Sequence, residues 1–314
     1  MRVKAIGIDI NDSRINGDLE ALEGDLAYFQ SCGFDAIELT TSGLYFVFNG
    51  ELDRERTRSI KTLLDKFPFR YTLHLPDCLN LGNSPAPELD RRVFSSCLDF
   101  AGEVEAEVVV YHSGQEFFDL HSQKQREQAL SRETRVLREM AEKALQFGIL
   151  IGVENLNPGM GELTMLHDKG LSKDEIRMLH PALFLDPIAA QIGEINAPNL
   201  ALTLDPGHLN LAVEVTGEDL LSSIENQAHL VRHLHLNDNF GKNPDNRYSQ
   251  MEQVLYGRAD CHLPLGMGSI PIREVLKRLS TFEGFVIFEM RPEYREHLPD
   301  SLAALRKHVA ELFG

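Results

Sequence analysis

The feature that most constrains the fold of this chain is a regular alternation of short apolar runs with longer amphipathic stretches. Eight runs have the length and apolar character of buried strands: residues 3–9, 34–39, 70–75, 107–112, 149–154, 200–205, 231–236 and 284–289. The stretches over 18–33 and 126–148 have helical spacing of apolar residues, and each ends on a glycine that can stop a helix. A last helix is predicted over 301–314. Strands and helices in strict alternation predict an α/β fold with a parallel sheet.

Eight such strands suit a closed (β/α)8 TIM barrel, which commonly exceeds ~200 residues in one domain. An open, doubly wound sheet is the alternative, but no GxGxxG turn follows the first strand. We therefore predict a single barrel domain over residues 1–314. The connections 155–183, after the fifth strand, and 237–269, after the seventh, are longer than barrel loops usually are. Both leave from the carboxyl ends of strands, where barrel enzymes carry their chemistry.

The balance of charges restricts the partners of the chain. It has 31 Lys and Arg against 48 Asp and Glu, a formal net charge of −17, which repels phosphate backbones and acidic membranes. No apolar run approaches the ~20 residues of a membrane span, and the N-terminus lacks an apolar signal core. The four cysteines lack the paired spacing of disulfides or metal sites: Cys32, Cys78, Cys97 and Cys261. These features predict a cytoplasmic protein with reduced thiols and without nucleic-acid or membrane partners.

An ionisable residue stands at the last inward-facing position of every strand-like run. These residues are Asp9, Glu38, His74, His112, Glu154, Asp205, His235 and Glu289. Each of them, taken alone, is explained by its position at a strand end, where the chain reaches solvent and polar residues are common. Five carboxylates and three imidazoles around one axis would repel or desolvate one another unless a cation compensated them, so the set indicates a divalent metal.

The four residues from the last four strands form the strongest candidate metal site. Glu154, Asp205, His235 and Glu289 are a mixed oxygen and nitrogen set that suits Mn²⁺, Mg²⁺, Co²⁺ or Zn²⁺. Asn155, Asn237 and Asp238 directly follow two of these strands, where they either orient ligands or substrate or simply form turns.

Further polar residues lie close to these positions in the sequence. His208 follows Asp205 across a Pro206–Gly207 bend, and Asp260 and His262 stand two residues apart in the long seventh loop. Arg291 is a candidate for substrate binding, with a surface ion pair as the equal alternative.

The other histidines have simpler interpretations. His233 shares a face with His235 one layer deeper, so we interpret it as a hydrogen-bonded core histidine. Six histidines are predicted to be solvated on helices or outer loops: His121, His167, His180, His229, His297 and His308.

An ordered series of short motifs resembles a known family. The motifs are VEN at 153–155, LDPGH at 204–208, HLHLNDN at 233–239, HLPLGMG at 262–268 and FEMRPE at 288–293. Together they are similar to the xylose isomerase-like TIM barrel superfamily, which includes sugar isomerases, sugar epimerases and endonuclease IV. Relatives are often dimers or tetramers, which implies a homo-oligomer.

Resemblance to the sugar isomerase and epimerase branch implies one metal on the four candidate ligands. In that branch, Glu154 and Glu289 would be the catalytic residues that exchange protons with a sugar or sugar phosphate through a metal-stabilised enediolate. The substrate contacts expected beside them are His208, His74, His112, Asn155 and Arg291.

Resemblance to endonuclease IV implies a different chemistry on the same barrel. That branch holds three zinc ions on nine ligands, and this sequence has a match for each: His74, His112, Glu154, Asp205, His208, His235, Asp260, His262 and Glu289. Such a site would hydrolyse phosphodiesters, as in an abasic-site nuclease. However, residues 40–53 lack the Arg or Lys expected of a loop that clamps DNA. We therefore predict a sugar isomerase or epimerase, with the zinc phosphoesterase and then a non-catalytic ligand-binding barrel as alternatives.

Overall fold

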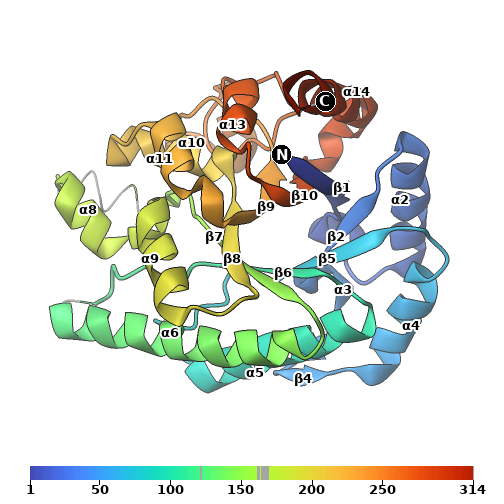
Figure 1. The fold of residues 1–314 in the computed structure, drawn as a ribbon, viewed down its shortest axis with the longest axis horizontal. Helices are drawn as coiled ribbons and strands as arrows, with labels where there is room; N and C mark the ends of the chain where they lie inside the picture. The colour runs from blue at the N-terminus through green and yellow to red at the C-terminus, as the bar shows by residue number, and fades with distance from the viewer. Residues whose placement is uncertain (121, 161–162, 164–169, 314) are drawn as a thin grey trace.

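The computed structural model contains a closed barrel of eight strands surrounded by helices (Figure 1). The structure describes residues 1–313 except 121, 161–162 and 164–169. The barrel strands are β1 (Arg2–Asp9), β2 (Ala36–Thr40), β5 (Arg70–His74), β6 (Val108–His112), β7 (Leu150–Glu154), β8 (Leu200–Leu204), β9 (Val231–Leu236) and β10 (Glu283–Phe288). Each pairs in parallel with its neighbours, and β1 closes the ring between β10 and β2. This topology confirms the predicted (β/α)8 barrel and excludes the doubly wound sheet.

Every predicted strand is present, and its ends shift by no more than two residues. Asp205 and Glu289 lie directly after β8 and β10 instead of being their last residues. The α-helices are α1 (Asp12–Ile15), α2 (Leu19–Cys32), α3 (Thr41–Leu44), α4 (Arg54–Leu64), α5 (Pro87–Glu103), α6 (Gln123–Leu145), α8 (Lys173–Leu179), α9 (Leu185–Ile195), α10 (Pro206–Thr216), α11 (Leu220–Gln227), α12 (Gln250–Leu255), α13 (Ile272–Arg278) and α14 (Leu298–Phe313). Short 3₁₀ helices are η1 (Pro181–Leu183), η2 (Ala228–Leu230) and η3 (Pro292–His297).

The ends of the predicted helices follow their capping residues. Asp18 accepts hydrogen bonds from the first turn of α2, and Gly33 ends that helix with φ of 91°. The helix predicted from residue 126 begins earlier, because Ser122 forms a capping box with Gln125. No helix in the described part of the chain is long and apolar enough to cross a membrane.

The interior of the barrel changes character along its axis. Towards the amino ends of the strands it is filled by a small apolar cluster: Ala5, Ala36, Val108, Val110, Phe285 and Ile287. Towards the carboxyl ends the buried side chains are polar, among them Glu38, Thr72, Thr203, His233 and His235. The larger apolar core lies between the barrel and its helices. The amino-terminal half of the barrel interior is therefore a packed apolar core, and the polar side chains gather in the carboxyl-terminal half, where barrel enzymes have their active sites.

The long connections are more ordered than the sequence indicated. Residues 155–183 contain α8 and η1, and residues 237–269 contain α12 and an isolated bridge between Asp238 and Leu263. The segment after β2 also contains α3 and a two-stranded hairpin, β3 (Val47–Phe48) with β4 (Glu51–Leu52), which the sequence analysis treated as a loop.

Candidate metal centre

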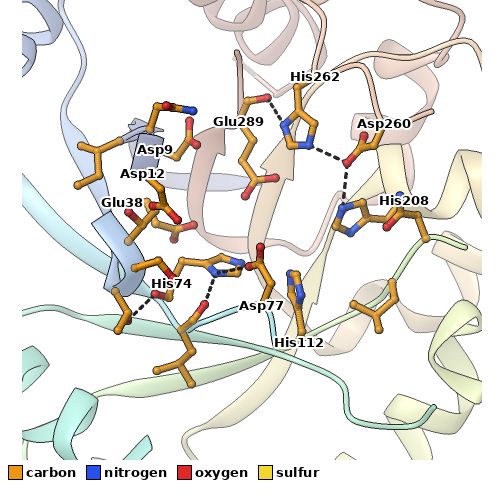
Figure 2. Close-up of a pocket in the computed structure, with 18 of the residues that line it drawn as sticks. Asp9, Asp12, Glu38, His74, Asp77, His112, His208, Asp260, His262 and Glu289 are labelled. Carbon is orange, nitrogen blue, oxygen red and sulfur yellow. Dashed lines mark hydrogen bonds and ion pairs between the residues drawn. The ribbon is translucent and has the colours of Figure 1, made fainter. Parts of the chain in front are cut away.

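A cavity of about 570 Å³ opens at the carboxyl ends of the barrel strands. Figure 2 shows His262, Asp260 and His208 on one side of it, Asp9, Asp12 and Glu38 on the other, and Glu289 between them. The volume lies within the range of small-molecule sites, ~300–1,000 Å³.

The structure brings the four strongest candidate ligands together in the barrel interior, and Glu289 among them lines this cavity. One ligand atom from each of Glu154, Asp205, His235 and Glu289 lies within 4.8 Å of the others, and all four residues are buried. Nδ1 of His235 lies 2.9 Å from Oε1 of Glu154 and 3.2 Å from Oε1 of Glu289. Each residue comes from the carboxyl end of a different strand, β7 to β10, so the barrel itself sets the geometry.

Asp205 is held in place by its own backbone surroundings. Its side chain caps α10 by accepting from the amide of His208 at 2.9 Å, while Asn237 Nδ2 donates to its second oxygen at 3.1 Å. Asn155 fixes the main chain of Asp205 from both sides, donating to its carbonyl at 2.9 Å and accepting from its amide at 3.0 Å. Both ends of the Asn155 amide are thus bonded to the main chain and Asn155 does not line the cavity, while its contact with substrate stays a prediction.

The expected bend at Pro206–Gly207 is also wrong. Both residues lie in the first turn of α10, and Gly207 is needed for space and not for a turn. A Cβ atom at Gly207 would lie 2.2 Å from Oδ1 of Asn237. His208 reaches the cavity because it follows Asp205 by almost one helical turn.

In three histidines around the cavity, the Nδ1 atom of the ring forms a hydrogen bond with a backbone carbonyl. Nδ1 of His74, His208 and His262 donates to Leu75, Asn155 and Glu289 respectively, at 2.7–2.9 Å. A carbonyl can only accept, so in the neutral rings the lone pair is on Nε2. This is the usual arrangement of a metal-binding histidine.

Two further groups of ligand atoms adjoin the four-residue set. Nε2 of His74 and of His112 each lie 3.4 Å from Oε2 of Glu154, whereas His235 approaches Oε1. Nε2 of His208 and of His262 lie 3.3 Å and 2.7 Å from Oδ2 of Asp260. His208, Asp260 and His262 form one compact group, and His74, His112 and the exposed Asp77 form another.

Charges within the site move the pKa values in opposite directions. Burial alone would raise the pKa of Glu154, but the imidazoles of His235 and His112 hold it well below its usual value. Burial alone would lower the pKa of His235, but the carboxylates of Glu154, Glu289 and Glu38 raise it well above its usual value. Burial raises the pKa of Glu289 to about 8, and the charge of Glu154 adds to this effect.

These residues fit a divalent cation. An unprotonated Nδ1 of His235 would place its lone pair against two carboxylates at 2.9 and 3.2 Å, so this contact requires a proton shared among the three groups or a positive ion. The high pKa of His235 reports the protonated alternative. Three carboxylates and one imidazole could hold the ion in place of that proton.

Metal binding is therefore expected to release protons. In the metal-free protein, burial raises the pKa of Glu289 to about 8, so this carboxyl carries a proton at pH 7, and the surrounding carboxylates raise the pKa of His235 and favour its protonated form. A bound cation displaces these protons, so its apparent affinity rises with pH until both groups are deprotonated. Titration calorimetry with Zn²⁺ in two buffers of different ionisation enthalpy should show at least one proton released per ion. Equal heats in the two buffers would contradict the assignment of these ligands.

The remaining predictions have mixed outcomes. His233 is buried and bonded to Glu38 at 2.9 Å, which confirms the core assignment. His229 is exposed, and His297 and His308 are partly exposed, as expected for outer positions; His121 and His167 lie outside the described residues. The prediction for His180 is wrong: this residue is fully buried against Phe118, because η1 packs the connection after β7 onto the barrel.

Arg291 is likewise not brought into the cavity. Its guanidinium donates to the carbonyl of Asp260 at 2.8 Å, and the residue is absent from the cavity lining. It therefore supports the loop that carries Asp260.

The sequence analysis missed how that loop is held. Asp238 accepts from the amides of Asn239, Gly266, Gly268 and Ile270 at 2.9–3.1 Å, which ties both ends of the segment together. The two glycines of GMG at 266–268 were the available signal, because Gly266 has φ of 86° and a Cβ at Gly268 would clash with Asp238.

Comparison with solved structures supports the same fold over the full length of the chain. A D-tagatose 3-epimerase-like protein matches with a TM-score of 0.70 at 20% identity, with 98% of each chain covered. A 3-keto-D-glucoside 4-epimerase from E. coli matches with a TM-score of 0.64 at 16% identity, covering 98% of this chain and 100% of that chain. A D-allulose 3-epimerase from Methylomonas sp. in complex with D-allulose has a TM-score of 0.64 at 14% identity, covering 98% and 97%.

Sequence comparison identifies the family directly. No curated protein matches the chain. A family profile described as xylose isomerase-like TIM barrel matches residues 26–308. Since this match covers most of the sequence and the barrel topology agrees with it, the chain belongs to the xylose isomerase-like TIM barrel family.

Proposed function

We propose that this protein is a divalent-metal-dependent isomerase or epimerase of an unphosphorylated sugar. The observation that carries the proposal is the convergence of ligand atoms of Glu154, Asp205, His235 and Glu289 within 4.8 Å of one another, with Glu289 lining a cavity at the barrel mouth. The sugar epimerases among the structural neighbours support the same class of substrate, although their likeness shows only the fold.

Glu154 and Glu289 are the groups proposed to move protons. Both approach the same ring nitrogen of His235, so their carboxylates face one small volume, although β7 and β10 are separated in the barrel by β8 and β9. A sugar carbon next to a carbonyl, placed in that volume, can give its proton to one carboxylate and receive a proton from the other. A cation held by the four ligands would neutralise the negative charge that develops on the substrate oxygen.

The charge of the cavity favours an unphosphorylated substrate. Beyond the candidate ligands, its lining includes Asp9, Asp12, Asp77 and Glu116. Among the residues that the structure describes, none lining this cavity is Lys or Arg. A phosphate would therefore meet carboxylates and no side-chain cation apart from protonated histidines.

The test is solvent hydrogen exchange at substrate carbon. The metal-loaded protein is incubated in D₂O with a panel of free ketoses and aldoses and with the matching sugar phosphates. Proton transfer to and from carbon should place deuterium next to the carbonyl of at least one free sugar, read by NMR, and leave the phosphates unlabelled. Turnover of a sugar without deuterium incorporation would contradict the proposed proton transfer.

A multinuclear zinc phosphoesterase is the second candidate, favoured by one specific observation. Glu154 lies between His74 and His112 on one side and His235 on the other, as a carboxylate that bridges two ions would. The group of His208, Asp260 and His262 could hold a third ion. If elemental analysis gives a content of about three zinc ions per chain and the protein cleaves a DNA duplex with an abasic site, this proposal replaces the first one.

A further inference from the structure

Glu38 is a buried carboxylate that the proposed reaction does not use. It extends from β2 into the barrel interior and is fully buried. Oε2 accepts from Thr72 Oγ1 at 2.7 Å and from His233 Nε2 at 2.9 Å, and Oε1 lies 2.9 Å from Nε2 of His235. His235 therefore stands between Glu38 on one side and Glu154 with Glu289 on the other.

This position has a consequence for the ring of His235. In the metal-loaded protein, where a cation would compensate Glu154 and Glu289, a lone pair on Nε2 would oppose the Oε1 lone pairs of Glu38 across 2.9 Å in the buried interior, so the proton of the neutral ring is expected on Nε2. The lone pair is then on Nδ1, the atom that faces Glu154 and Glu289. His74, His208 and His262 obtain their tautomer from backbone carbonyls, but His235 obtains it from a side chain.

We propose that Glu38 is a positioning residue that fixes the tautomer and orientation of His235, so that Nδ1 is presented as a metal ligand. Thr72 and His233 hold the carboxylate in turn. The inference rests on the proposed metal centre and adds to it a residue outside the set of four ligands. Carboxylates that orient metal-binding histidines typically contribute 10- to 100-fold to metal affinity.

The first experiment observes the tautomer directly. The Zn²⁺-loaded protein, labelled with ¹⁵N histidine, is examined by long-range ¹H–¹⁵N correlation, and His235 is assigned with a His235→Gln variant. The proton is expected on Nε2 in the wild type. A proton on Nδ1 of His235 in the zinc-loaded protein would overturn the proposal even without a Glu38 variant.

The second experiment measures Zn²⁺ affinity by competition with a chelator. Glu38→Gln should raise the dissociation constant for Zn²⁺ about 10- to 100-fold. Thr72→Val is the matched control: it removes a hydrogen bond to the same carboxylate but leaves the contact of Glu38 with His235, so its dissociation constant should stay within about threefold of the wild type. Equal affinities of wild type and Glu38→Gln would overturn the inference.

Zn²⁺ binding by a Glu154→Gln variant distinguishes an error about Glu38 from an error about the metal centre itself. If this variant loses Zn²⁺ but Glu38→Gln does not, only the role of Glu38 is wrong. If neither variant changes Zn²⁺ binding, the proposed centre is wrong as well.

Discussion

Replacing either Glu154 or Glu289 by Gln is expected to lower turnover of the sugar identified by deuterium exchange by about 10²–10⁴-fold, the range for loss of a general acid or base. An amide has nearly the shape of a carboxylate but cannot accept a proton from carbon. Circular dichroism and thermal unfolding should show a folded barrel in both variants, since the two side chains lie at strand ends and not in the apolar core.

The control for this prediction is Glu194→Gln, which removes a carboxylate from the exposed surface of α9. Its turnover should equal that of the wild type. Metal content must be measured for every variant, because a loss of the ion would lower turnover without any change in proton transfer. A variant of Glu154 or Glu289 with full activity would exclude the proposed mechanism.

Metal binding should stabilise the protein strongly. The four ligands are buried, and their three carboxylates are compensated only in part by protons in the metal-free protein. An ion at about 1,000 times its dissociation constant adds ~4 kcal/mol, which corresponds to a rise in Tm of about 10 °C at ~2–4 °C per kcal/mol for a large domain. Differential scanning fluorimetry after chelation, and after addition of Mn²⁺, Co²⁺, Zn²⁺ or Mg²⁺, measures this shift.

The matched variant for the stability prediction is Asp205→Asn. Asn can still cap α10, so the metal-free variant should fold, while one charged ligand is lost. The Tm shift with metal should shrink to a few degrees at the same ion concentration. A shift as large as that of the wild type would place the stabilising ion at another site.

The barrel and the convergence of the four candidate ligands could be predicted from the sequence because both depend on local pattern. Apolar runs at strand spacing fix eight strands, and parallel strands bring their carboxyl ends to one rim. Glu154, Asp205, His235 and Glu289 therefore converge whatever the details of the loops.

The role of Glu38 could not be predicted in the same way. Its strand, β2, is separated from β9 in the barrel by β1 and β10, so its contact with His235 crosses the interior. Such a contact depends on side-chain length and barrel diameter, which leave no periodic signal in a sequence. The sequence placed Glu38 among the ionisable strand-end residues. No feature of the sequence distinguished a residue that orients a metal-binding histidine from a residue that binds the metal itself.

The partners of several loop residues could likewise not be predicted. Arg291 and Asn155 were expected to contact substrate, but their polar groups satisfy main-chain atoms of Asp260 and Asp205. His180 was expected in solvent and is buried. The partner of Asn155 is set by the pairing of β7 with β8, whereas the surroundings of Arg291 and His180 depend on how a long connection folds back on the barrel, a non-local event that composition does not encode.

The central claim is that one divalent ion is held by Glu154, Asp205, His235 and Glu289. It is tested most directly by a crystal structure of the protein loaded with Zn²⁺ or Mn²⁺, with anomalous difference maps recorded at the absorption edge of the metal. We expect a peak at coordination distance, ~2.0–2.2 Å for zinc, from a side-chain atom of each of the four residues, including Nδ1 of His235. A metal-loaded protein with no peak among these residues would contradict the account.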